Sequence, residues 1–401
     1  MKQQKILFAI FFLLLIAISF GVKFIEFDNP YSGFHQKRQL DNLTAMEDYF
    51  LEGTDLLKRR TVAGGYVLYE LPFYQALAAL LSPSLGKILS TARIISLVFA
   101  LLSMILLFKI ASTWFDVKTA IYSTLFFSFA PLNLMYHRAV MMDVSSVFFC
   151  LAATWLLVEY LESKKKMWKS FLFVVAGGLS VTMKPLYFLP VGAIALANYI
   201  IQYRPPFFAN ATNYVKKNLG LVISFLLITT IMLGWLLIVG EASDTGGLGM
   251  LSPLSQWGFL LSPKFYALLI FRVFFLVLNP FTCVLFMIGM VLIWTHYRKK
   301  DAIALLFSIP LYYIIFGHIN FPHEYYSLIM VPYCSLIAGV GAVWLEERLS
   351  LDSLIRRREL TLGIFCVFAS VVSVLFFILN FIVGAPNLEQ KPIQIEREMH
   401  S

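Results

Sequence analysis

Residues 27–42 read FDNPYSGFHQKRQLDN and residues 64–81 read GGYVLYELPFYQALAALL, and both belong to one long polar stretch between the first two apolar segments. The stretch runs from about residue 23 to residue 87, whereas most of the remaining chain is apolar enough for lipid-embedded helices. Connections between helices are usually far shorter, commonly about 4–6 residues. A loop of this length, rich in acids, bases and aromatic residues, predicts a binding or reaction site.

The composition places the chain among helical integral membrane proteins. Of its 401 residues, 59% are hydrophobic and only 14% are charged, and the mean hydropathy is +0.78. Soluble domains are about 45–50% apolar and about 25% charged. The net charge of +9 does not indicate nucleic acid, because the basic residues cluster in short gaps between apolar runs. The four cysteines lie inside apolar runs without a CxxC or Cys/His pattern, so no disulfide framework or structural metal site is indicated.

The apolar runs predict about eleven transmembrane spans, since one span needs about 20 apolar residues. They cover approximately residues 5–22, 88–112, 118–136, 143–161, 169–183, 185–202, 218–240, 266–294, 302–317, 325–345 and 361–383. With a cytoplasmic N-terminus, more than half of the lysines and arginines fall into short inner loops, as the positive-inside rule requires. We therefore expect an all-α polytopic protein in which residues 1–401 form a single transmembrane domain.

The same topology gathers four polar regions on the outer face, with Lys184 beside them; they are residues 23–87, 137–143, 241–265 and 317–326. Within the first region, Leu40 to Leu57 and Leu71 to Leu85 have apolar residues at helical spacing. Both patterns predict amphipathic helices on the membrane surface. The loop 241–265 is interpreted as a cap over a substrate.

The first candidate cluster, in the long loop, consists of Asp28, Arg38, Asp41 and Glu70. Arg38 and Asp41 are three residues apart and share one face if the segment is helical. A carboxylate held near a basic residue at the membrane surface can serve as a general base. The alternative is an ordinary solvated ion pair, since any outer loop needs charged residues.

Three further ionisable residues lie in short outer links, where polar groups at membrane depth are costly and usually functional. Arg138 and Asp143 follow the third span, and Lys184 separates the fifth and sixth. The arginine fork and the lysine ammonium suit a phosphate, while the aspartate could hold a metal ion or orient the arginine. The alternatives are a buried Arg–Asp pair that joins two helices and a lysine that snorkels to the interface.

The last outer turn, GHINFPHEYY at residues 317–326, supplies two histidines, a carboxylate and two tyrosines. Its His-x4-His-Glu spacing matches no standard metal signature, and an aromatic interface belt is the alternative. No GxxxxGK[ST], GxGxxG or HExxH motif occurs in the sequence. Nucleotide hydrolysis and zinc peptidase chemistry therefore have no support.

In order and placement, these motifs resemble the GT-C glycosyltransferases that use polyprenyl-phosphate sugars, especially the bacterial branch related to protein O-mannosyltransferases and to the aminoarabinose transferase of lipid A. The likeness extends from the first helix to about residue 345. Many relatives carry an Asp-Glu pair soon after the first helix, and this chain lacks it. The motifs are RQLDNLTAMEDYFLEG (Arg38 to Gly53), YELPFY (Tyr69 to Tyr74), TAR (Thr91 to Arg93), APLNLMYHRAVMMD (Ala130 to Asp143), MKP (Met183 to Pro185) and HEYYSLIMVP (His323 to Pro332).

The resemblance implies an inverting glycosyltransferase on the outer face of a bacterial inner membrane. Such an enzyme would move a sugar from a polyprenyl-phosphate donor to a lipid, glycan or protein acceptor, with the lipid tail entering between helices. The implied catalytic base is Asp41 or Asp28. The implied donor-phosphate ligands are Arg138, Lys184 and Arg38, with Asp143 holding a divalent ion (Mg²⁺ or Mn²⁺) or orienting a neighbour. The implied substrate contacts are Glu70, Tyr74, His323 and Tyr325.

Three other classes of protein stay open at this point, and one of them is a structural or assembly protein, which fits if the outer clusters do not converge. A lipid-linked glycan flippase or transporter would usually place polar residues near span midpoints. An O-antigen ligase or polymerase tends to carry its large outer loop late in the chain, whereas here the long loop comes first. The transferase interpretation requires the outer clusters to converge beside a groove that is open to lipid.

Overall fold

A bundle of helices forms the structure, a computed structural model with no strand among the residues it describes. Those residues are 2–25, 27–28, 35–57, 59, 61, 70–162, 167–202, 207–242, 257–297, 300–349, 367–375 and 377. The helices are α1 (Lys2–Lys23), α2 (Gln36–Glu52), α3 (Phe73–Leu85), α4 (Ile88–Trp114), α5 (Val117–Phe129), α6 (Pro131–Tyr136), α7 (Asp143–Glu162), α8 (Met167–Met183), η1 (Pro185–Phe188), α9 (Leu189–Gln202), α10 (Phe207–Lys217), α11 (Leu219–Ala242), η3 (Trp257–Leu261), α12 (Pro263–Arg272), η4 (Val273–Val277), α13 (Pro280–Leu292), η5 (Ile293–Tyr297), α14 (Lys300–Asn320), η6 (Glu324–Ile329) and α15 (Met330–Leu349). The expected all-α fold class is confirmed.

Five of the described helices are long and apolar enough to cross a membrane, or up to six when one bent pair counts as a span. Three shorter apolar helices cover 12–23, 167–183 and 185–200. The expected count of about eleven spans is therefore not confirmed. The eleventh predicted span, 361–383, lies largely outside the described residues, which include only 367–375 and 377 there.

The predicted span 266–294 is wrong as one helix, because the chain turns by 105° between residues 277 and 280. Asn279 and Pro280 cause the break. The Asn279 side chain accepts from the Thr282 backbone N–H at 2.8 Å, and the Asn279 N–H donates to the Thr282 hydroxyl at 3.0 Å. This capping box starts a new helix, and proline at its first position needs no hydrogen-bond donor.

The centre of the bundle is α15, which packs between α5 and α13. Of the most apolar 18 residues in the span that contains α15, 89% are buried inside the protein. The corresponding share for α11 is 28%. Glycines allow this packing: a Cβ on Gly341 would collide with the Leu285 carbonyl, and one on Gly289 with the Ile337 carbonyl. Small residues that let helix backbones approach closely are typical of the contacts between transmembrane helices.

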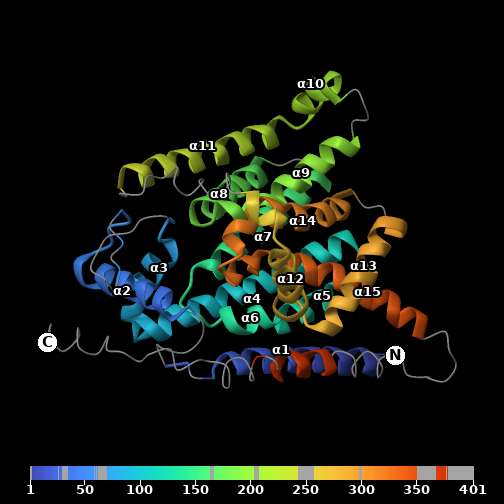
Figure 1. Cartoon of the computed structure of the whole chain (residues 1–401), viewed down its shortest axis with the longest axis horizontal. Coiled ribbons are helices and arrows are strands. Elements are labelled where there is room, and N and C mark those ends of the chain that lie inside the picture. The colour runs from blue at the N-terminus through green and yellow to red at the C-terminus, as the bar shows by residue number, and fades with distance from the viewer. Residues whose placement is uncertain are drawn as a thin grey trace.

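The two helices predicted in the first outer loop are present as α2 and α3, which pack on each other and on α4. Figure 1 shows them together at one end of the bundle, while α1 and α11 run along opposite sides. Three further parts of the chain approach this end: the Val140 carbonyl after α6 accepts from Asn42 on α2, the Lys184 ammonium pairs with Glu70 before α3, and the Tyr325 hydroxyl of η6 accepts from Arg38 on α2. The end that carries α2 and α3 therefore brings together described parts of the predicted polar regions 23–87, 137–143 and 317–326, with Lys184. Of the loop 241–265, which the sequence suggested as a cap, residues 243–256 lie outside the described residues.

Candidate active site

Glu70 is the centre of a buried charge cluster, which we define as Glu70, Arg38, Arg59, Lys184 and Asp143. Glu70 is only 5% exposed. One nitrogen of Arg38, Nη2, lies 2.9 Å from both carboxylate oxygens of Glu70. The Lys184 ammonium forms an ion pair with the same carboxylate, and Arg59 Nη1 lies 3.6 Å from Oε2. Three cations from separate segments thus surround one carboxylate.

Backbone and amide hydrogen bonds hold these segments in place. The Leu71 N–H donates to the Thr182 carbonyl at 3.0 Å, which brings Glu70 next to the residue after α8, Lys184. On α2, Gln39 accepts from the Val140 N–H at 3.0 Å, and Asn42 donates to the Val140 carbonyl at 2.7 Å. These contacts fix α2 to the turn after α6 and thereby set the position of Arg38.

The charge state of Glu70 follows from its neighbours. Burial disfavours the carboxylate, but the charges of Arg38, Lys184 and Arg59 outweigh burial and lower the pKa of Glu70 to about 2. Glu70 is therefore ionised at neutral pH. A carboxylate that three cations hold in this way is a poor proton acceptor, so its role is to organise the cations.

Asp143, the second carboxylate of the cluster, opens α7 and is fully buried. Its Oδ1 accepts from the Tyr187 hydroxyl at 3.0 Å and lies 3.5 Å from Lys184 Nζ. Its Oδ2 is buried without a hydrogen-bond partner among the residues described. Buried carboxylate oxygens are normally satisfied, so Oδ2 keeps an unused capacity to accept a hydrogen bond.

Residues of η6 also contact the charge cluster. The Tyr325 hydroxyl accepts from Arg38 Nη1 at 3.0 Å, and the Lys184 ammonium lies 4.5 Å from the ring centre of Tyr326. Glu324 Oε1 accepts from the Tyr136 hydroxyl at 2.6 Å and lies 3.1 Å from His35 Nε2. The outer turn before α15 thus supplies a third carboxylate and two aromatic walls.

Several residues named from the sequence come together here, namely Arg38, Glu70, Asp143, Lys184 and Tyr325. His323 lies beside them, with its ring centre 5.4 Å from that of Tyr325. Arg138 is buried in the turn between α6 and α7.

Other named residues lie elsewhere. Asp28 is exposed and accepts from the Ser90 hydroxyl at 3.1 Å. Tyr74 is fully buried, and its hydroxyl donates to the Ala92 carbonyl at 2.8 Å, which suits a packing role better than substrate contact. Asp41 is half-buried on α2 and acts electrostatically on Arg59.

Sequence reasoning missed Arg59, His35, Tyr136 and Tyr187 as site residues. Two of them had a spacing signal: His35 precedes Arg38 by three residues, and Tyr187 follows Lys184 by three. No spacing signal points to Arg59, because its distance from Glu70 depends on how the long loop folds.

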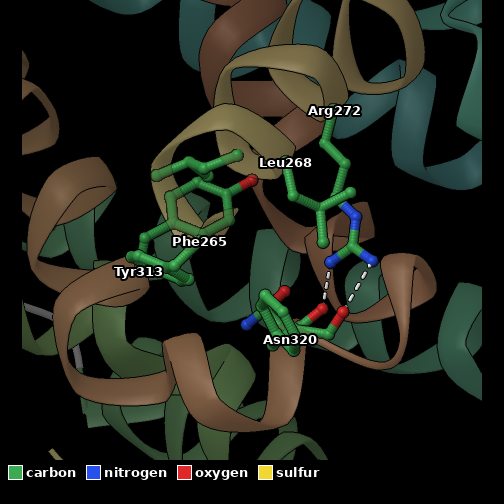
Figure 2. Close-up of a pocket in the computed structure, with 7 residues that line it drawn as sticks. Phe265, Leu268, Arg272, Tyr313 and Asn320 are labelled. Atoms are coloured by element: carbon green, nitrogen blue, oxygen red, sulfur yellow. Dashed lines mark hydrogen bonds between the residues drawn. The ribbon is translucent and has the colours of Figure 1, made fainter. Parts of the chain in front are cut away.

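A small pocket lies between α12 and α14, next to the turn that precedes η6. Figure 2 shows the residues that line it. The Arg272 guanidinium donates there to the carbonyls of Asn320 and Phe321, the latter at 3.0 Å. Arg272 is 7% exposed. It therefore anchors the backbone turn that leads into His323 and Glu324, while the pocket itself does not include the charge cluster.

Comparison with known proteins gives a family match for part of the chain. Residues 71–235 match the family model described as dolichyl-phosphate-mannose-protein mannosyltransferase. A search of curated proteins by sequence found no match.

Solved structures resemble the chain over most of its length. ArnT from Cupriavidus metallidurans bound to undecaprenyl phosphate has a TM-score of 0.67 at 12% identity, and the alignment covers 93% of this chain and 78% of that one. An Archaeoglobus fulgidus oligosaccharyltransferase in complex with Zn and sulfate has a TM-score of 0.62 at 13% identity, covering 92% and 52%. AglB from the same organism, in complex with an inhibitory peptide and a dolichol-phosphate, has a TM-score of 0.56 at 11% identity, covering 97% and 59%. The chain has the GT-C fold that its motifs resembled, and it spans about half the length of the oligosaccharyltransferase.

The described residues do not fit the expected Mg²⁺ or Mn²⁺ ion. They contain no group of three or more His, Cys, Asp or Glu side chains that could hold a metal ion. Asp143 lies 3.5 Å from the Lys184 ammonium, and three cations surround Glu70. These charges oppose a divalent cation, so Asp143 is better suited to orienting its neighbours.

Proposed function

We propose that the chain is an inverting glycosyltransferase that takes a sugar from a polyprenyl-phosphate donor at the Glu70 cluster. The observation that carries this proposal is the convergence of Arg38, Arg59 and Lys184 on one buried site beside two carboxylates. Buried cations from three segments at one end of a membrane-embedded bundle suit an anionic lipid headgroup. The undecaprenyl phosphate and dolichol-phosphate bound to the structurally similar ArnT and AglB support the same donor class.

The charge balance of the cluster fits a donor of this kind. Three cations face two carboxylates, which leaves one positive charge in excess. A sugar attached to a polyprenyl phosphate is a phosphodiester and carries one negative charge. When the sugar–oxygen bond breaks, the leaving phosphate gains a second charge. The fixed cations stabilise that new charge most strongly, which is how a preorganised site lowers a reaction barrier.

The proposed reaction is a direct displacement at the sugar C1. The acceptor oxygen attacks C1 as the bond from C1 to the phosphate oxygen breaks, and the polyprenyl phosphate departs with the electron pair. Arg38 and Lys184 stabilise the negative charge of the departing phosphate. Arg138, in the neighbouring turn, is proposed as a further phosphate ligand. Asp143 Oδ2, which has no protein partner among the described residues, would accept a hydrogen bond from a sugar hydroxyl.

The acceptor proton needs a base on the first outer loop. Of the two aspartates there, Asp41 is the better candidate, because it lies on α2 one turn beyond Arg38. Asp28 is exposed and bonded to Ser90. We propose that the acceptor, a lipid, glycan or protein, approaches from the outer side of a bacterial inner membrane. The excess of basic residues in the short inner loops supports this orientation.

Donor kinetics of one lysine variant test the proposal. Lys184→Gln removes a cation from the phosphate site, so we expect the KM for a polyprenyl-phosphate sugar to rise about 10-fold or more, with a fall in kcat. Lys169→Gln is the matched control, because Lys169 is also buried and pairs with a glutamate, Glu159, at 2.9 Å. Equal effects of the two substitutions, or unchanged donor kinetics in Lys184→Gln, would remove the support for this site.

A further inference from the structure

His35 has an unusual backbone conformation. It is the only non-glycine residue with a positive φ among those described, with φ 54° and ψ 45°. Left-handed backbone costs free energy for residues with a side chain, and such strain is kept where the surrounding structure needs it. His35 precedes the first turn of α2, but its side chain makes no capping hydrogen bond there. The imidazole instead makes its contacts with residues outside α2.

Those contacts fix the orientation of the ring. Nε2 of His35 lies 3.1 Å from Glu324 Oε1, which also accepts from the Tyr136 hydroxyl at 2.6 Å. An ionised carboxylate can only accept hydrogen bonds, so Nε2 carries the proton in this pair. Nδ1 of a neutral His35 is then left with its lone pair. A carboxylate that orients an imidazole in this way is the arrangement that acid–base catalysis uses.

His35 also lies at the open side of the charge cluster. The side chains of His35 and Arg38 are 24% and 27% exposed, whereas those of Glu70, Lys184 and Asp143 are at most 6% exposed. Tyr325 separates the two open residues: its hydroxyl accepts from Arg38, and its ring lies edge-on to His35 with centres 4.8 Å apart. His35 and Arg38 are therefore both accessible to an acceptor, one on each side of Tyr325.

We infer that His35, oriented by Glu324, takes the proton from the acceptor hydroxyl, in place of either first-loop aspartate. The inference rests on the proposed glycosyl transfer at this cluster. The acceptor O–H proton moves to Nδ1, the acceptor oxygen forms the bond to C1, and the C1–phosphate bond breaks with its electron pair on the polyprenyl phosphate. Glu324 stabilises the imidazolium, which returns its proton to water.

The geometry favours His35 over Asp41, because Glu324 Oε1 holds Nε2 of His35 at 3.1 Å and leaves Nδ1 for the acceptor proton. Asp41 acts electrostatically on Arg59, a residue that is only 6% exposed. Among the described residues, the charged and titratable groups beside His35 are Glu324, His323, Tyr136 and Tyr325, with Arg38 three residues further along the chain.

Chemical rescue tests the inference on the full-length protein. His35→Gly suits the left-handed backbone and removes the imidazole. With a polyprenyl-phosphate sugar that the wild type uses, we expect kcat to fall about 100-fold or more, with the donor KM within about 3-fold of wild type. Added imidazole should then restore kcat in a saturable manner. Glu52→Gln, at an exposed position on α2, is the control and should keep the kcat of the wild type, with no response to imidazole. Asp41→Asn is assayed in parallel.

The outcomes separate the inference from the proposed function. Full activity of His35→Gly overturns the role of His35, and so does a loss that imidazole does not restore. A 100-fold loss in Asp41→Asn with little loss in His35→Gly assigns the base to Asp41 and leaves the proposed transfer intact. A wild type that transfers sugar from no donor overturns both.

Discussion

Glu70 shows how a single buried side chain can organise a site. Its carboxylate holds Arg38 through two 2.9 Å contacts and also pairs with Lys184 and Arg59. Removing one partner from a buried ion-pair network leaves uncompensated charge, which costs about 3–5 kcal/mol. The cations cannot stay at these positions without Glu70, so we regard it as the residue on which the geometry of the cluster depends.

A pH-dependent stability follows from Glu70. Because its folded-state pKa is about 2 and its ordinary value is 4.5, the stabilisation is complete above about pH 4.5 and is lost as the pH falls towards 2. Its size is about 3 kcal/mol. Thermal unfolding of Glu70→Gln in detergent should start at a lower temperature at pH 7 and lack this part of the acid dependence.

The control is Glu52→Gln, which makes the same change at an exposed position on α2. Its unfolding temperature should follow that of the wild type at every pH. If Glu70→Gln and Glu52→Gln behave alike, Glu70 does not hold the cations together.

At the scale of helices, α13 and α15 form the closest packing that we describe. Gly341 and Gly289 face backbone carbonyls of the opposite helix, which cannot move aside as a flexible side chain can. Gly341→Ala should therefore destabilise the protein by about 1–3 kcal/mol, as overpacked cores do. Gly234→Ala on α11 is the control, because a Cβ there meets nothing within 4 Å. It should be neutral or stabilise by up to about 1 kcal/mol. Equal unfolding temperatures for the two variants would contradict this packing.

Arg272 links the broken helix pair to the turn that leads into the candidate active site. It donates to two carbonyls at the end of α14, just before His323 and Glu324 (Figure 2). Arg272→Gln should cost about 3 kcal/mol, because charged donors are lost from two carbonyls in a largely buried place. Hydrogen exchange should become faster in residues 320–326. Arg348→Gln, at an exposed site over the Trp344 ring, should leave both stability and exchange unchanged.

At the scale of the whole molecule, apolar periodicity predicted the helical class and the two helices of the first loop. It failed at residues 266–294, since an Asn-Pro pair inside an apolar run gives a weaker signal than the run itself. The site was predicted in part. Arg38, Asp143, Lys184 and Tyr325 were named because ionisable and aromatic groups stood in outer turns. Arg59 and His35 could not be placed, because their partners lie 11 and 289 residues away in sequence.

Orientation in the membrane gives a prediction for the entire chain. The proposed topology puts the α2–α3 end outside and the start of α5 inside. In a cysteine-free background, a membrane-impermeant maleimide should label Glu52→Cys in intact cells but should label Lys118→Cys only after lysis. Both positions are exposed on the protein surface, so access depends on the side of the membrane. Labelling of Lys118→Cys in intact cells would reverse the orientation and move the site to the inner face.

The central claim is that the buried cations receive the phosphate of a lipid-linked sugar. The most direct measurement is release of polyprenyl phosphate from a panel of polyprenyl-phosphate sugars by purified protein, wild type against the double variant Arg38→Gln with Lys184→Gln. We predict sugar transfer from at least one donor by the wild type and at least a 100-fold loss in the double variant. Absence of transfer from every donor, or equal transfer by a folded double variant, would contradict the claim.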